Sequence, residues 1–217
     1  SSDLGRTGSL LVRDGKLIDP LPQGTREICN LDSVLKSAPV PRFTPEQRKS
    51  QNRIQSDTGE IKVDYTGQTL SLVTPRTEAA IFPEDATFRG NHLTARADKF
   101  FGMIAAITLN GNSFTDSNRL LLIHVTDCKQ ENSLYDSRKL SVLKNYGDLQ
   151  HVLARHGICE ITLSLSKGKW KIYALNFDGA RLGEVPFQQN GQSIRFIADT
   201  FYGNDQVAFA YELVKER

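Results

Sequence analysis

The chain is poor in cysteine and has no long apolar run. Its three cysteines, Cys29, Cys128 and Cys159, lie far apart and form no Cys-x-x-Cys pair. This pattern excludes a disulfide scaffold and gives no zinc-binding spacing. We expect buried free thiols, whose redox state and cellular compartment the sequence leaves open. No apolar stretch approaches the roughly 18 residues of a membrane-spanning helix, so no membrane contact is expected.

An excess of charge of one sign is also missing. Lys and Arg total 27 against 25 Asp and Glu, which gives a formal net charge of +2. The basic residues occur in short scattered pairs such as Arg48-Lys49 and Arg138-Lys139. The sequence therefore gives no reason to expect nucleic acid as a partner. With 39% hydrophobic residues, the 217-residue chain can still bury a core.

Motifs for metal or nucleophilic catalysis are absent. The four histidines, at positions 92, 124, 151 and 156, form no His-x-x-x-His or His-Glu-x-x-His pattern, and no Gly-x-Ser-x-Gly occurs. His124 lies in an apolar run and is expected in the core or on a sheet face. No cofactor is expected. A structural calcium between Asp199 and Asp205 is conceivable, although that segment lacks an EF-hand pattern.

Acidic residues offer two further catalytic hypotheses. Asp57-Thr58-Gly59 occurs once, so an aspartic protease would need a homodimer with two Asp57 side chains in contact. Because Asp57 does not end a hydrophobic strand, we interpret it as a turn residue. A glycosidase needs two carboxylates flanking the sugar. No motif marks such a pair, and we expect the acidic candidates to be surface residues on strands: Asp64, Glu78, Glu160 and Glu184.

The first 54 residues differ from the rest. They contain five of the eight prolines and little periodicity. Residues 10–18 suggest a small hairpin that turns at Asp14-Gly15. Thr44-Pro45 is typical of a helix start, and that helix would end by about Asn52. We expect residues 1–54 to be an irregular extension or linker that packs on the main domain.

Residues 55–217 are dense in strand patterns. Residues 60–65 and residues 69–74 each alternate between polar and apolar side chains, as half-buried strands do. In the segment 169–175, Trp170, Ile172 and Ala174 share one face, which favours a core position for the tryptophan. Further strands are expected at 78–82, 92–96, 100–109, 120–126, 158–165, 181–187, 192–198 and 206–213; residues 149–156 fit a strand or a short helix. Many short strands without interposed helices predict an all-β, antiparallel β-sandwich, jelly-roll-like.

Several short motifs occur in a recognisable order. They are Asp57–Ile61 (DTGEI), Pro75-Arg76 within a TPR corner, Leu109-Asn110-Gly111, and Ser117–Leu122 (SNRLLL). Together, residues 55–215 resemble the C-terminal β-sandwich region that follows a (β/α)8 catalytic barrel in large bacterial glycoside-hydrolase-like proteins. Asn110 stands where that family typically has Asp, but Asn-Gly serves a hairpin turn equally well.

The resemblance implies a non-catalytic accessory domain, with the catalytic domain of the same polypeptide as a partner. It also implies a secreted, periplasmic or cell-surface location. Polysaccharide or oligosaccharide would then be the ligand, if one binds. A site for sugar needs an exposed aromatic face beside amides and carboxylates. The candidates, all in expected loops, are Tyr135 beside Asn132, Tyr146 beside Asp148, and Tyr202 beside Asn204.

Two functions stay open on these grounds. The domain binds carbohydrate, or it is purely structural and buttresses a catalytic domain. A binder should expose a planar or concave aromatic surface. A buttress should expose an apolar patch that matches its partner domain.

Overall fold

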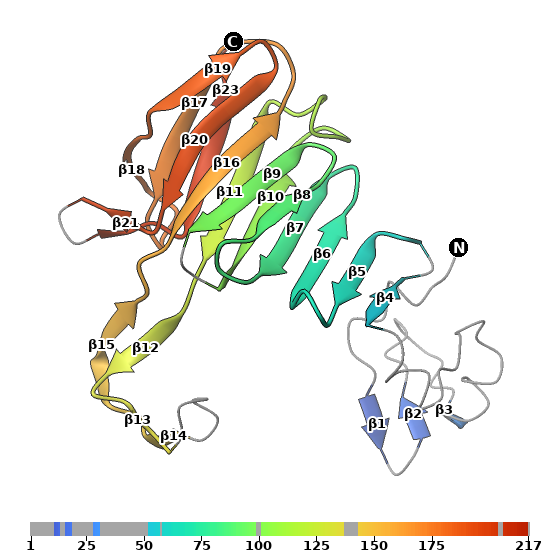
Figure 1. Ribbon diagram of the computed structural model, residues 1–217, viewed down its shortest axis with the longest axis vertical. Coiled ribbons are helices and arrows are strands. Elements are labelled where there is room, and N and C mark those ends of the chain that lie inside the picture. Colours follow the sequence, from blue (N-terminus) through green and yellow to red (C-terminus); the bar gives the residue numbers. More distant parts are fainter. Residues whose placement is uncertain are drawn as a thin grey trace. The chain divides into compact units, whose positions relative to one another are not determined.

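The computed structural model describes residues 11–13, 16–18, 28–30, 52–56, 58–98, 101–136, 143–203 and 206–216 (Figure 1). The chain forms two compact units, residues 1–50 and 51–217. All regular structure in the described residues is β-strand, and the strands pair antiparallel. The expected all-β antiparallel sandwich is therefore confirmed. The described residues include no helix long and apolar enough to cross a membrane.

The first unit contains a three-stranded sheet. Strand β1 (Leu11–Arg13) pairs with β2 (Lys16–Ile18), which pairs with β3 (Ile28–Asn30). The antiparallel pairing of Arg13 with Lys16 confirms the hairpin expected in residues 10–18, while Asp14 and Gly15 themselves lie outside the described residues. The helix expected from Thr44 lies outside the described residues.

The second unit is built on a nine-stranded sheet. Its strands are β4 (Arg53–Gln55), β5 (Ile61–Asp64), β6 (Thr69–Val73), β7 (Thr77–Phe82), β10 (Gly102–Thr108), β11 (Arg119–Val125), β17 (Trp170–Leu175), β18 (Arg181–Glu184) and β23 (Ala210–Lys215). Their order across the sheet is β18-β17-β23-β11-β10-β7-β6-β5-β4. Strands β4 to β7 thus follow one another as a meander, and β4 forms one edge.

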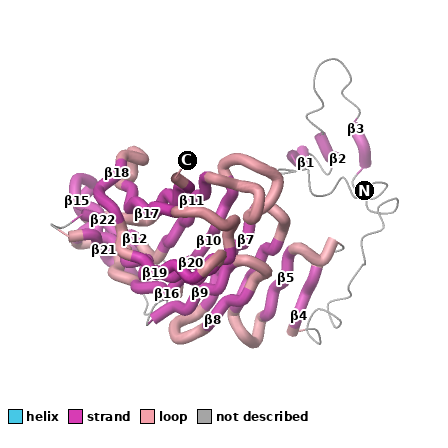
Figure 2. The backbone as a smooth tube through the Cα atoms, turned by 90° about the horizontal axis from the view of Figure 1, so that it is seen from above, coloured by secondary structure: helices cyan, strands magenta, loops and turns pink. Residues whose placement is uncertain are grey.

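A smaller sheet packs against part of the first. Its strands are β8 (Thr87–Arg89), β9 (Leu93–Asp98), β16 (Ile158–Ser164), β19 (Phe187–Asn190) and β20 (Ser193–Asp199), in the order β19-β20-β16-β9-β8. Figure 2 shows the two layers from above. The core lies between them, and Trp170, Ile172 and Ala174 are all buried in it, as expected. The largest fully buried side chains are those of Phe82, Leu93, Ile104, Phe114, Leu120, Leu122, Ile161, Leu163, Leu165, Ile172 and Tyr211.

A separate two-stranded ribbon, here called the arm (residues 127–155), connects β11 to β16. It pairs β12 (Cys128–Glu131) with β15 (Asp148–Ala154), and near its tip β13 (Leu134–Tyr135) with β14 (Leu143–Asn145) (Figure 1). None of its described side chains is buried. At its base, the backbone amide of Arg155 donates to the Asp127 carbonyl at 2.7 Å. A last small hairpin, β21 (Phe201–Tyr202) with β22 (Gln206–Val207), precedes β23.

Candidate functional site: an apolar sheet face and an arm

The outer face of the nine-stranded sheet, turned away from the five-stranded sheet, carries two apolar rows. Each row takes one residue from each of six neighbouring strands. The first row is Ile54, Val63, Leu70, Ile81, Met103 and Val125, and the second is Ile61, Leu72, Ala79, Ala105, Ile123 and Ala210. Every residue in them except Ala105 is at least partly exposed, and Ile61 reaches 45%.

The strands beneath these rows are apolar on both faces. In β10, Met103 and Ile107 point outward while Ile104 and Ala106 lie in the core. Such two-sided runs are typical of sheets covered on both sides, whereas a sheet with one face in water alternates apolar and polar residues. The five-stranded sheet follows the second pattern. Its outward positions are largely polar and include Thr94, Arg96, Asp98, Glu160, Thr162 and Arg195.

Strands β4, β5 and β6 contain no buried residue. Their positions on the core side of the sheet are mostly polar, and there Arg53 Nε pairs with Asp64 Oδ2 at 2.8 Å. The Gly67 amide and Arg53 together hold the pKa of Asp64 below its usual value. The apolar side chains of β5 and the pair Leu70 and Leu72 all belong to the outer face. Apart from Val73, which packs against the core, these strands can therefore bury apolar side chains only against something that covers the outer face.

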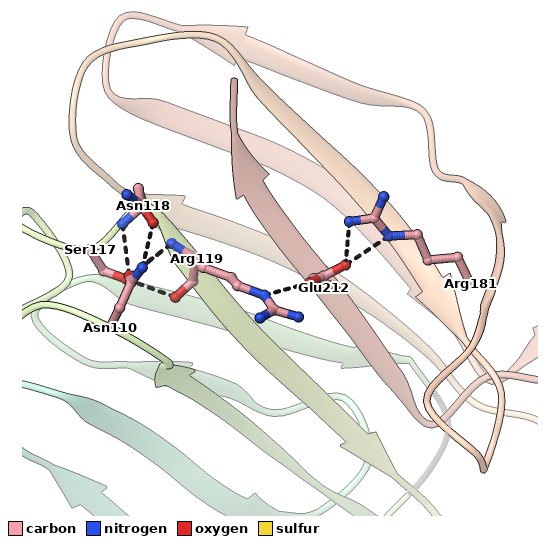
Figure 3. A network of polar contacts seen from close by, with 6 residues as sticks. All are labelled: Asn110, Ser117, Asn118, Arg119, Arg181 and Glu212. Atoms are coloured by element: carbon pink, nitrogen blue, oxygen red, sulfur yellow. Dashed lines mark hydrogen bonds and ion pairs between the residues drawn. The ribbon is translucent and has the colours of Figure 1, made fainter. Parts of the chain in front are cut away.

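A charged cluster borders the apolar rows. Leu121 lies opposite Glu212 in the next row, and Glu212 lies opposite Tyr173. The Glu212 carboxylate receives Arg119 Nε at 2.6 Å and Arg181 at 2.7 Å (Figure 3). Burial acts to raise the pKa of Glu212, but the bonds and charges of Arg181 and Arg119 outweigh it and lower that pKa. The Arg181 guanidinium also stacks on the Tyr173 ring, 3.8 Å from its centroid.

The motif residues near Arg119 have structural roles. Asn110 Oδ1 accepts hydrogen bonds from Ser117 Oγ at 2.8 Å and from the backbone amides of Asn118 and Arg119 (Figure 3). Its Nδ2 donates to Asn118 Oδ1. An Asp at position 110 would accept the same three bonds but lack that donor. The network ties the β10–β11 connection to the start of β11.

One acidic candidate is not on the surface. Glu78 is fully buried, which corrects the expectation that it is a surface residue. Its carboxylate accepts the backbone amides of Asn91, His92 and Leu93, the last at 2.7 Å. A Cβ at Gly90 would lie 2.1 Å from Glu78 Oε2, so only glycine fits beside it. Both buried carboxylates of the described chain, at positions 78 and 212, thus serve structural contacts.

Three other sequence expectations have clear outcomes. His124 is buried as expected, and burial lowers its pKa to about 4. Cys159 is a buried free thiol, and burial raises its pKa to about 12. Cys128 is free but exposed, because no described side chain of the arm that carries it is buried, so the expectation of burial was wrong there. The side chain of Cys29 lies outside the described residues.

Asp57 also lies outside the described residues. Its neighbours form a turn, since the Gly59 amide donates to the Ser56 carbonyl at 3.0 Å and Gly59 has φ +75°. Glycine adopts this left-handed conformation without strain.

The arm brings together four of the six residues proposed for sugar binding. Asn132 takes φ +59° in the turn after β12, and Tyr135 is partly buried with Lys129 Nζ 5.6 Å from its ring centroid. Tyr146 is 70% exposed. Asp148 begins β15. Tyr202 is elsewhere, in β21, packed against the core; Asn204 lies outside the described residues.

Beside these residues the arm gathers a cluster that the sequence did not indicate. The Asp148, His151 and Glu131 donor atoms all lie within 4.8 Å of one another. His151 Nδ1 is 2.9 Å from Asp148 Oδ2 and 3.5 Å from Glu131 Oε2. This set can hold a metal ion, and the Asp-x-x-His spacing was the only local signal for it.

The five-stranded sheet has a shallow hollow of about 630 Å³ on its outer face. Its lining includes Phe187, Gln188 and Ile197, and the pair Glu160–Arg195 at 2.7 Å. The two charges of that pair neutralise each other. No aromatic ring in the hollow is more than partly exposed, so the hollow is not a planar aromatic platform for a sugar.

Comparisons of the chain with protein family models, curated proteins and solved structures found no match.

Proposed function

We propose that residues 51–217 are a non-catalytic accessory domain of a polysaccharide-degrading protein, and that they buttress its catalytic domain. The observation that carries this proposal is the pair of apolar rows on the outer face. Of the two functions left open by the sequence, the buttress is the one that requires an exposed apolar patch.

The energetics favour a covered face. Full burial of one Val, Leu, Ile or Met side chain contributes about 1.5–3 kcal/mol, and eight of the twelve row residues are Val, Leu or Ile. The partly exposed rows realise only a fraction of that. A partner over this face would bury the rest and would also cover β4 to β6, in which no residue is buried.

The occupant we propose is the (β/α)8 barrel of the same polypeptide. Such a barrel presents an outer ring of helices, and a helix layer on a sheet is one of the stable ways to bury an apolar sheet face. Small residues (Ala79, Ala105 and Ala210) occupy three of the six positions of the second row and permit close approach of a helix. The charged cluster around Glu212 would lie at the rim of this interface, where polar contacts set the register.

The test is to measure binding of this chain to the separately expressed barrel of its polypeptide. Met103→Lys places a charge in the first row, and Ile197→Lys places one on the outer face of the other sheet, where Ile197 is 45% exposed. We expect Met103→Lys to weaken binding at least about tenfold and Ile197→Lys to leave it unchanged. Equal binding by both variants, each shown to be folded, would refute the proposal.

Carbohydrate binding by the arm is a second candidate, favoured by the 70% exposure of Tyr146 beside Asn145 and Asp148. Retention of the chain on insoluble β-glucans, xylans and mannans tests it. Tyr146→Ala should abolish retention, whereas Tyr65→Ala should not, because Tyr65 is 59% exposed in an unrelated turn. Retention that survives Tyr146→Ala would remove the arm from consideration.

A further inference from the structure

The acidic pair and the imidazole on the arm are brought together by an irregular strand pairing. Gln130 lies opposite Val152, but the next residue, Glu131, lies opposite Asp148. Three residues of β15 are therefore bulged out between those two pairs, and His151 is one of them. The bulge places the His151 ring beside the carboxylates of Glu131 and Asp148.

Two carboxylates share this cluster, and among the described residues their one ion-pair partner is His151, which carries a charge only when protonated. Glu131 and Asp148 bring two carboxylates within 4.8 Å of each other. Among the described residues neither forms an ion pair with Lys or Arg; the nearby Lys129 and Arg155 both pair with Asp127 instead. Two like charges at this distance repel, and a bound divalent ion would remove that repulsion.

We propose that Glu131, Asp148 and His151 form a binding site for a divalent transition-metal ion of the zinc type. One imidazole nitrogen and two carboxylate oxygens are donors that Zn²⁺ accepts at about 2.0–2.2 Å, with water completing the shell. Such bonds place neighbouring ligands roughly 3.4 Å apart in a tetrahedral site. His151 Nδ1 is already 3.5 Å from Glu131 Oε2, and its 2.9 Å hydrogen bond to Asp148 Oδ2 would be replaced by bonds of both atoms to the metal. The nitrogen donor selects against Ca²⁺ and Mg²⁺, which prefer all-oxygen sites.

The site would also act on the arm itself. Glu131 is on β12 and the other two ligands are on β15, so a bound ion cross-links the two strands at the point where their register is broken. Because no described side chain of the arm is buried, this cross-link would be its strongest internal restraint. Metal should therefore slow amide hydrogen exchange in residues 128–154.

Isothermal titration calorimetry of the whole chain with ZnCl₂, free of any affinity tag, tests the site. We expect one ion per chain, with affinity lowered at least about tenfold by His151→Gln and by Asp148→Asn. His156→Gln is the matched control, because His156 Nε2 is 2.8 Å from Asp199 Oδ1 but belongs to no three-donor cluster found in the described residues. Cys128→Ser controls for the exposed thiol on β12.

The outcomes separate clearly. Loss of affinity in the two ligand variants alone, with slower exchange in the arm on adding zinc, supports the site. Absence of binding at about 1 mM zinc, or equal binding by ligand and control variants, overturns it. Tighter binding of Ca²⁺ than of Zn²⁺ would also overturn it, since the imidazole would then not be a ligand. Trp170 fluorescence verifies that each variant is folded.

Discussion

His124 should make the domain sensitive to mild acid. Its ring lies in the core opposite Ile104, and burial lowers its pKa from 6.5 to about 4. Above pH 6.5 both the folded and the unfolded chain carry it neutral. Between pH 6.5 and about 4 only the unfolded chain takes up the proton, so the free energy of unfolding falls as the pH falls. Between about pH 7 and pH 4.5, protonation of His124 in the unfolded chain should lower the free energy of unfolding by about 2 kcal/mol.

The variant His124→Leu isolates that contribution. Leucine keeps a similar volume and cannot titrate, so its own effect near pH 7 should stay below about 1.5 kcal/mol. Urea unfolding at about pH 7 and pH 4.5, followed by the fluorescence of the single, buried Trp170, gives both free energies. The variant should lose about 2 kcal/mol less than the wild type between the two pH values.

Ile104→Val is the matched control. It perturbs the residue opposite His124 in the same core but leaves the titrating group in place, so it should keep the full wild-type loss. Equal losses in the wild type and His124→Leu would refute the reasoning, because burial of His124 would then not be coupled to its charge.

Three further substitutions test contacts described above. Asn110→Leu should cost about 1–3 kcal/mol in urea unfolding, since three donors lose their acceptor, whereas Asn110→Asp should stay within about 1 kcal/mol of the wild type. Glu212→Gln should lower the free energy of unfolding by about 1–2 kcal/mol near pH 7. The difference from the wild type should shrink as the pH falls through the lowered pKa of Glu212, because the wild type then loses the same charge. A difference that does not vary with pH would contradict this. Gly147→Ala should speed hydrogen exchange in the arm, because its Cβ would lie 2.1 Å from the Glu131 carbonyl oxygen; Gly191→Ala, with open space and φ +60°, should leave arm exchange unchanged.

The strands of the sandwich could be predicted where the alternation of side chains in the sequence matches which of them are buried. Alternation in β5, β6 and β17 gave the correct strands, and the phase of Trp170 with Ile172 placed it in the core. The antiparallel pairing of β1 with β2 was likewise predicted, from the turn-forming residue types between them. Each of these signals lies within a few residues of the feature it predicts.

The remaining features depend on contacts between distant residues. Glu78 accepts amides 13 to 15 residues away, and no local pattern announces such a contact. The arm was missed because its described side chains are all at least partly exposed and its strands therefore lack an apolar period. Residues 149–156 fitted a short helix as well as a strand. The register break that assembles its acidic cluster is not encoded in any one strand. The outer face had a local signal, the two-sided apolar run of β10, but only the strand order shows that six strands share it.

The unbalanced size of the two sheets has a consequence for how the domain opens. With no buried side chain in β4, β5 or β6, this end of the large sheet should be, together with the arm, among the least stable cooperative units of residues 51–217. It should exchange its amides through local opening rather than global unfolding. Because β4 is the edge strand, opening can proceed strand by strand from it while the core stays intact. A partner bound over the outer face would suppress this local opening. The amide exchange rate of β4 to β6 would therefore report whether the outer face is covered.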